Sequence, residues 1–426
     1  MRNLKKKVYP FIGEEVYFTV LDNGMKVYLL PKPEFQETSA MLTVDFGSID
    51  NILTVDGKHI EYPKGLAHFL EHQLFEREDS IDVAQLFTKH GADSNAYTSY
   101  EKTSYFFSTI DHLEDSLTLL QNFVVNPKFT EMSIEKEKGI IIQEIEMYQD
   151  DPDFQLYSGL LRSLYPNTPL SEDIAGDEQS VNQTTLLHLQ DMVNFFYNPV
   201  NFSLLLVGPF DVRKMHHFLM QNQVIAETEP SFHVMKHHLN LEPVQISKSM
   251  RMDVSMAKLA VGFRGPLPKE GEVLRQKIAL RLLFSMLFGW TSQIYQEWYD
   301  SGKINDSFDI EVEVSPRFKF VALLFDTNQP ISMVNQIKQY LKNFSTSPDL
   351  NEVHLLEIKK EFYGEFIRSL DSIDNLANQF VAYSTEGQTY YDIPEILQEL
   401  TLSEIIQMGN DFFQQSDMSD FTIFPR

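Results

Sequence analysis

Two histidines and a glutamate near position 70 have the spacing of a metal-binding motif. They stand in the order His68-Phe69-Leu70-Glu71-His72. Residues four apart on an α-helix share one face, so His68 and His72 can offer two imidazoles to one metal ion. Glu71 lies on nearly the same face, where its carboxylate can reach a water molecule at that metal. The order H-x-x-E-H reverses the more common H-E-x-x-H zinc signature.

The alternative interpretation of this motif is an amphipathic helix whose histidines lie at the edge of a core. The three polar groups lie beside the apolar residues Leu66, Phe69 and Leu70. Half-buried polar groups without partners cost stability, whereas a metal ion would satisfy them. The sequence therefore favours a metal site.

A third ligand is expected, because catalytic zinc usually has three protein ligands and a fourth position for water. The segment 135–147 carries Glu135, Glu137, Glu144 and Glu146. Glu137 and Glu144 are two helical turns apart and share a face, so Glu144 can bind the metal while Glu137 holds the other ring nitrogen of a ligand histidine. Spacing alone leaves all four glutamates open, and a solvent-exposed helix of mixed charge is the alternative.

The two motifs together, H-x-x-E-H followed by E-x6-E at 137–144, resemble the pitrilysin/insulysin family of inverzincin metallopeptidases, which includes the mitochondrial processing peptidases. The resemblance implies one Zn²⁺ per chain, held by His68, His72 and Glu144. It also implies that Glu71 is the general base and that Glu137 supports a ligand histidine. The family is built from two related α+β domains, which form half of a clam-like chamber.

Composition narrows the class of protein. A chain of 426 residues is expected to form two or more domains, and without cysteine it has no disulfides and no thiolate ligands. The net charge of −26 disfavours nucleic acid and anionic membranes as partners. The basic N-terminus is followed by polar residues instead of a signal core, and no apolar run is long enough to span a membrane. We therefore expect a cytoplasmic protein.

The order of predicted elements indicates an α+β fold with two related domains. We expect an N-terminal domain at 1–221, a linker at 222–242 and a C-terminal domain at 243–426. The segment 50–64 is polar and is predicted to be a loop. A further metal site at the histidines of the linker is disfavoured, because no carboxylate there has ligand spacing. These histidines are His233, His237 and His238, with His216 and His217 just upstream.

The segment 95–107 predicts two short strands around a polar turn. From this segment alone, an edge strand with aromatic packing is the simplest interpretation. In the family, an N-A-x-T strand pairs with an extended substrate, a mode of peptide binding that demands little of the sequence. The resemblance therefore implies that Asn95, Ala96 and Tyr97 bind substrate.

The second half repeats the organisation of the first but lacks H-x-x-E-H. Many family members also carry an arginine and a tyrosine, seven residues apart, that bind substrate. The corresponding positions here hold Trp298 or Tyr299 and Asn305 or Asp306, depending on register, so the pair is missing. We therefore expect a heterodimer with a zinc-less paralogue that carries the pair. A homodimer in which Trp298 or Tyr299 contacts substrate is the alternative.

The expected function is zinc-dependent hydrolysis of extended peptides or small unfolded polypeptides. Two alternatives come from other classes of protein. One is a non-catalytic scaffold subunit of the same family, although such subunits have eroded motifs and this motif is intact. The other is a peptide-binding subunit without turnover, which would keep the Asn95 strand but would not need Glu71.

Overall fold

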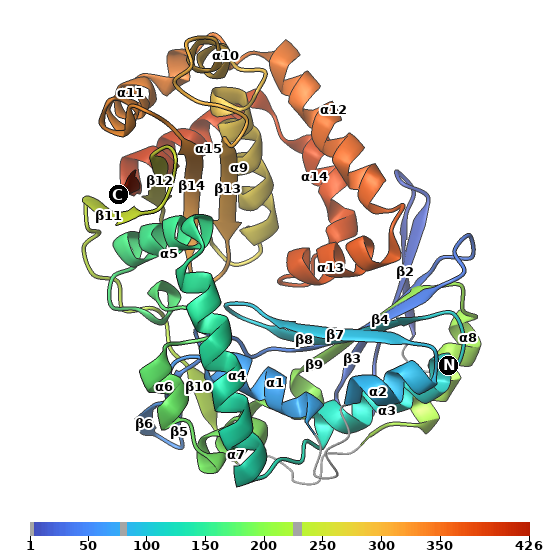
Figure 1. Cartoon of the computed structure of the whole chain (residues 1–426). Helices are drawn as coiled ribbons and strands as arrows, with labels where there is room; N and C mark the ends of the chain where they lie inside the picture. The colour runs from blue at the N-terminus through green and yellow to red at the C-terminus, as the bar shows by residue number, and fades with distance from the viewer. Residues whose placement is uncertain (1–3, 77–82, 225–231) are drawn as a thin grey trace. The chain divides into compact units, whose positions relative to one another are not determined.

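The computed structural model describes residues 4–76, 83–224 and 232–426, which form two compact units (Figure 1). The first unit comprises Met1–Glu146, Glu172–His237 and Ser369–Ala382, and the second comprises Met147–Ser171, His238–Arg368 and Tyr383–Arg426. Each unit contains a mixed sheet with helices, which confirms the predicted fold class. No helix in the described ranges has the length and apolar composition that crossing a membrane requires.

The first unit is built on a seven-stranded sheet of order β1-β2-β3-β9-β4-β8-β7. Its strands are β1 (Lys5–Tyr9), β2 (Glu14–Val20), β3 (Lys26–Pro31), β4 (Thr38–Val44), β7 (Asp93–Thr98), β8 (Thr103–Thr109) and β9 (Phe202–Gly208). Only the β3–β9 pair is parallel among these strands. Strands β2 and β3 form a hairpin whose turn contains Asp22-Asn23-Gly24, a turn sequence typical of hairpins, with Gly24 at a φ of 91°.

The first unit has helices at both segments that carry the candidate metal ligands, as predicted. They are α1 (Leu66–Phe75), α2 (Val83–Lys89), α3 (Leu113–Val125), α4 (Glu131–Gln149), α6 (Glu178–Gln183), α7 (Leu186–Phe196), η2 (Pro199–Asn201) and α8 (Val212–Gln221). In Figure 1, α1, α2 and α3 lie along one face of the sheet. The core lies between them, where Leu70 and Leu74 of α1 share a buried cluster with Leu42 and Tyr105 of the sheet.

The predicted loop at 50–64 is wrong, because this segment forms a hairpin of β5 (Ile52–Val55) and β6 (Lys58–Glu61). The turn is Asp56-Gly57, with φ values of 49° and 81°, and Asp-Gly is a strong hairpin signal in a sequence. The predicted linker also contains a strand, β10 (Val234–Lys236), which pairs with β5. Residues 225–231 of that linker lie outside the described part of the chain.

The second unit has a five-stranded sheet of order β11-β15-β12-β14-β13. Its strands are β11 (Ser247–Met252), β12 (Lys258–Arg264), β13 (Asp309–Val314), β14 (Lys319–Asp326) and β15 (Asp417–Pro425). Its last strand, β15, lies parallel to β11 and antiparallel to β12, as β9 lies between β3 and β4 in the first unit. The order β3-β9-β4-β8-β7 thus recurs, as expected for two related domains.

The remaining helices divide between the units in a way that sequence order does not predict. They are α5 (Pro152–Leu164), η1 (Pro169–Ser171), α9 (Val273–Phe288), α10 (Gln293–Asp300), α11 (Pro330–Lys342), η3 (Phe344–Thr346), α12 (Glu352–Ser369), α13 (Ile373–Tyr383), η4 (Tyr390–Asp392), α14 (Ile393–Glu399) and α15 (Leu402–Gln415). Helix α5 joins the second unit, because Gly159 lets the ring of Phe421 in β15 approach closely. Most of α13 joins the first unit, where Phe380 contacts Tyr28 edge-on. The division into 1–221 and 243–426 therefore does not follow the packing of these segments.

Candidate metal centre

Helix α1 presents the H-x-x-E-H residues from a fixed starting point. Gly65 caps the helix at a φ of 77°, and a Cβ atom at this position would come within 2.2 Å of the Ala175 carbonyl oxygen. Glycine is therefore required at this position. Leu66, Phe69 and Leu70 bury the opposite side of the helix in the core, so the helix cannot rotate about its axis without exposing them.

Helix α4 supplies the carboxylates, and burial separates the four candidates. Glu137 is 4% exposed and Glu144 is half-buried, on the side of the helix that carries the buried Ile141. Glu146 is exposed, and the Glu135 side chain is 70% exposed, with an ion pair to Lys138 at 2.6 Å. Only Glu137 and Glu144 of the four approach the histidines.

The ligand atoms of His68, His72 and Glu144 gather at one point. Glu144 Oε2 lies 3.4 Å from His72 Nε2, and Glu144 Oε1 lies 3.7 Å from His68 Nε2. One ligand atom from each residue lies within 4.8 Å of the other two. Two ligands bound tetrahedrally to one zinc ion are roughly 3.3 Å apart, given bonds of about 2.0–2.1 Å. The donor set and its spacing therefore fit zinc.

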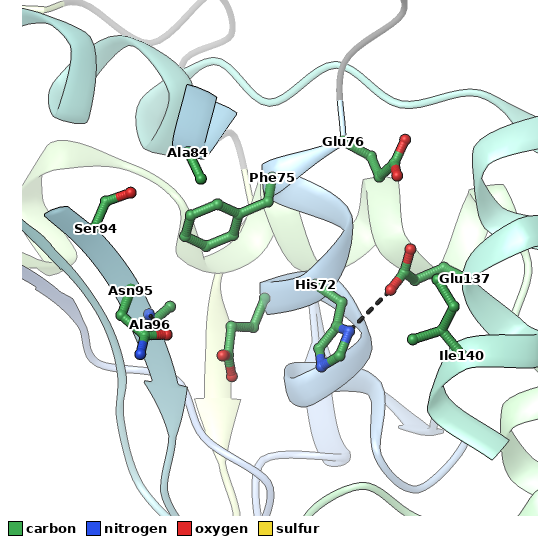
Figure 2. A pocket seen from close by; sticks show the side chains of 10 residues that line it. His72, Phe75, Glu76, Ala84, Ser94, Asn95, Ala96, Glu137 and Ile140 are labelled. Carbon is green, nitrogen blue, oxygen red and sulfur yellow. Dashed lines mark hydrogen bonds and ion pairs between the residues drawn. The ribbon is translucent and has the colours of Figure 1, made fainter. Parts of the chain in front are cut away.

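Glu137 fixes the orientation of His72. The Nδ1 atom of His72 lies 2.9 Å from Glu137 Oε1, shown as a dashed line in Figure 2. When Nδ1 donates its hydrogen to Glu137, the lone pair of Nε2 points away toward Glu144, which is the tautomer that a metal requires. In His68, by contrast, the buried Nδ1 atom has no hydrogen-bond partner among the described residues.

Burial and the neighbouring carboxylates shift the pKa values of the two histidines in opposite directions. Burial, together with the neighbouring His72, lowers the pKa of His68 to about 4. Burial also opposes the charge of His72, but hydrogen bonds to Glu137 and Glu144 outweigh it and raise the His72 pKa to about 10. One cation on His72 thus balances part of the carboxylate charge. A metal ion bound here would take over this role and release that proton.

Glu71 lies beside the cluster in a buried position. Its side chain is 8% exposed, and burial raises the Glu71 pKa to about 7 although the Thr98 hydroxyl donates a hydrogen bond to Oε2. Thr98 was not among the predicted site residues. Its signal in the sequence was the N-A-x-T pattern, in which Thr98 is the final residue.

A cavity of about 350 Å³ adjoins the cluster (Figure 2). It is lined by Glu71, His72, Phe75 and Glu76 of the α1 region, Ala84 of α2, Ser94, Asn95 and Ala96 of β7, and Glu137 and Ile140 of α4. Phe75 and Ile140 were not predicted, although each follows a predicted site residue by three positions on the same helix face. Because apolar and polar side chains both line the cavity, it can accept a side chain of a bound peptide.

Strand β7 lies at the end of its sheet, with an outer edge that pairs with no strand in the described ranges. Ser99 N donates to Lys102 O at 2.8 Å, and bonded and non-bonded pairs alternate along antiparallel strands. Ala96 and Thr98 therefore direct their main-chain groups to the outer edge, where Ala96 N donates to Asn95 Oδ1 at 2.8 Å. Asn95 and Ala96 line the cavity, whereas the Tyr97 hydroxyl points to Met41 Sδ at 3.9 Å.

The region aligned with the missing arginine–tyrosine pair lies in the second unit. Trp298, one of the two residues of the homodimer alternative, is 1% exposed and its indole donates to Gln336, so its side chain is not presented at the surface. Tyr299 is 49% exposed and stacks on Tyr295 with ring centroids 6.0 Å apart.

Among the described residues, His68, His72 and Glu144 are the one group with three ligand atoms together. His237 of the predicted linker instead contacts Thr54.

Comparison with known proteins identifies the family of the chain. Residues 27–178 match the sequence profile of insulinase-type peptidases (peptidase family M16), and residues 184–362 match that of the peptidase M16 inactive domain. The zinc protease YmfH of Bacillus subtilis, itself uncharacterised, is 35% identical over 408 residues, which cover 94% of this chain and 95% of that protein. The chain belongs to peptidase family M16.

Solved structures agree with this assignment. The crystal structure of an M16-like peptidase from Alicyclobacillus acidocaldarius superimposes with a TM-score of 0.90 at 30% identity, covering 97% of this chain and 99% of that one. A protease from Helicobacter pylori shares the fold, with a TM-score of 0.82 at 18% identity and coverage of 97% and 100%. The second profile also accounts for the absence of H-x-x-E-H from the second half.

Proposed function

We propose that this chain is a zinc-dependent endopeptidase that cleaves extended peptides or small unfolded polypeptides. The observation that carries the proposal is the convergence of the three ligand atoms beside a buried carboxylate and an open strand edge. His68, His72 and Glu144 would hold the zinc ion, and Glu137 would orient His72. Relatives of this chain include several proteins that are named zinc proteases, which supports the same activity.

A zinc ion held by His68, His72 and Glu144 would supply Lewis acidity at the scissile carbonyl and would lower the pKa of a water molecule. Glu71 takes a proton from the attacking water and then delivers it to the leaving amine. The outer edge of β7 would hold the substrate as an added strand through main-chain groups of Ala96 and Thr98. A substrate side chain would enter the adjoining cavity, so Asn95 and Ala96 would contact it, while Tyr97 would support the strand from the other face.

The test combines metal analysis with a quenched-fluorescence peptide assay. Glu71→Gln should keep one zinc per chain and lose about 10²–10⁴-fold in kcat, because only the proton acceptor is removed. His72→Ala should lose zinc, whereas Glu146→Gln should keep it because Glu146 is exposed and away from the histidines. Near-normal turnover by Glu71→Gln would exclude Glu71 as the base. Stoichiometric zinc in His72→Ala would refute the ligand set.

The same assay separates the endopeptidase from the two non-catalytic alternatives. A scaffold subunit would neither bind nor cleave the peptide. A peptide-binding subunit would bind it equally well with Glu71 or Gln at position 71, and the native chain would show no turnover. Zinc-dependent turnover by the native chain excludes both.

We further propose that the active assembly is a heterodimer with a zinc-less paralogue that carries the arginine and tyrosine. Support comes from the absence of the pair at positions 298–306 of this sequence and from the burial of Trp298. Activity should rise when the paralogue is added, and the mass of the complex should equal one copy of each chain. Full activity from a homodimer, unchanged by the paralogue, would exclude the heterodimer as a requirement. In that case Tyr299, which is exposed, becomes the candidate for substrate contact.

A further inference from the structure

Thr98 is the hydrogen-bond partner of the carboxylate that the mechanism needs. Its hydroxyl donates to Glu71 Oε2, and among the described residues this is the one hydrogen bond made to the Glu71 side chain. Glu71 Oε1 therefore accepts no hydrogen bond from the described residues. A carboxylate held by one oxygen in this way keeps its other oxygen available to accept a proton.

A second possible acceptor for the Thr98 proton is a hydroxyl at the limit of hydrogen-bond distance. The Thr98 hydroxyl lies 3.5 Å from the Thr103 hydroxyl, which is fully buried and donates its own proton to the Phe46 carbonyl oxygen at 2.9 Å. The Phe46 carbonyl oxygen accepts the hydrogen bond of Thr103, and Glu71 Oε2 accepts that of Thr98 in preference to the more distant Thr103 oxygen. A hydrogen bond to a charged acceptor is stronger than one between neutral groups.

Thr98 is also the last residue of β7, and its main chain faces the open edge. The register pairs Thr98 with Thr103, next to the bonded pair of Ser99 and Lys102. The main-chain groups of Thr98 are therefore directed outward, while its side chain lies on the α1 side of the sheet. The backbone of Thr98 thus faces the edge where a further strand could pair, while its hydroxyl binds Glu71.

We propose that Thr98 is a positioning residue that orients Glu71 for proton transfer and fixes it relative to a substrate strand on β7. This rests on the proposed peptidase function. The reason is geometric, because a base must lie within hydrogen-bond reach of the proton it abstracts and small misplacements are costly. Removal of the hydroxyl should therefore reduce the chemical step more than substrate binding.

The test compares Thr98→Val, which keeps the branched shape and removes the hydroxyl, with Thr98→Ser, which keeps the hydroxyl. Thr98→Val should lose about 10- to 100-fold in kcat, the effect of one hydrogen bond to a charged group, with KM changed by less than about threefold. Thr98→Ser should retain at least about a third of native kcat. Zinc content should be unchanged in both. Thr109→Val is the matched control, because Thr109 lies in β8 and donates to Asp111 O instead.

A second measurement does not depend on turnover. In crystals of zinc-loaded Thr98→Val the Glu71 carboxylate should leave its native position, and in Thr98→Ser it should keep it. Native kcat in Thr98→Val, equal losses in both variants, a loss confined to KM, or an unmoved Glu71 in the Thr98→Val crystal would each overturn the proposal. A native chain without peptidase activity refutes the proposed function instead, and a displaced Glu71 in Thr98→Val would still support the role of Thr98.

Discussion

Replacement of Glu137 tests how much its hydrogen bond to His72 contributes to zinc affinity at the candidate metal centre. Glu137 Oε1 lies 2.9 Å from His72 Nδ1, and the side chain is almost completely buried. Glu137→Ala removes the acceptor and leaves the Nδ1 hydrogen without a partner. Loss of such a support typically weakens metal binding about 10- to 100-fold. This corresponds to about 1.4–2.8 kcal/mol at 1.4 kcal/mol per tenfold.

Glu137→Gln should have a smaller effect, because the amide oxygen can still accept from Nδ1 but carries no charge. Zinc affinity would be measured for each variant by competition with a chromophoric chelator at fixed pH. Glu135→Gln is the matched control, since Glu135 lies on the same helix with an exposed side chain. Circular dichroism would verify that each variant remains folded.

The reasoning fails if Glu137→Ala binds zinc within about threefold of the native chain, or no more weakly than Glu135→Gln. Either result would mean that packing of α1 alone orients His72. A loss in Glu137→Gln as large as in Glu137→Ala would show that the charge of Glu137, and not the hydrogen bond, stabilises the site.

Two further predictions concern stability. Gly65→Ala should lower the free energy of unfolding by about 1–3 kcal/mol in urea titrations, from strain at positive φ together with a clash. Gly91→Ala, at a φ of 69° with open space around it, should lose less, and an equal loss would exclude the clash. Hydrogen bonds from Thr401 lower the pKa of Glu404 to about 2, below its usual 4.5. Its stabilising contribution should thus be complete above pH 4.5 and disappear as the pH falls toward 2, and Glu404→Gln should flatten that part of the stability–pH profile.

Elements with strong local signals could be predicted from the sequence. The hairpin at Asp22-Asn23-Gly24 and the helix around His68 depend on turn chemistry and on a period of 3.6 residues, both of which act over a few positions. The hairpin at 52–61 also had its signal, Asp56-Gly57, but polar composition favoured a loop there. In this segment the Asp-Gly turn, and not the polar composition, decides the structure.

The assignment of helices to sheets could not be predicted from order along the chain. Helix α5 follows the helices that carry the candidate ligands, yet it packs on the second sheet, where Gly159 accommodates Phe421. The segment 369–382 lies in the second half of the sequence, yet Phe380 packs against Tyr28 of the first sheet. The periodicity of the sequence identifies the apolar face of a helix. Which sheet covers that face depends on side chains far away in the sequence and on how well the two surfaces fit.

The sequence by itself determined the first two candidate metal ligands, since His68 and His72 are neighbours on any helix that contains them. It also narrowed the third ligand to four glutamates. Only the tertiary structure selected Glu144 as the residue near the histidines, because packing of α4 buries one face and leaves Glu135 and Glu146 in solvent. The contact between Thr98 and Glu71 was also visible only in the tertiary structure, because Thr98 lies at the end of an edge strand and Glu71 lies in a helix that packs on the sheet. Spacing along one helix is fixed by backbone geometry, whereas contacts between elements depend on how their buried faces pack.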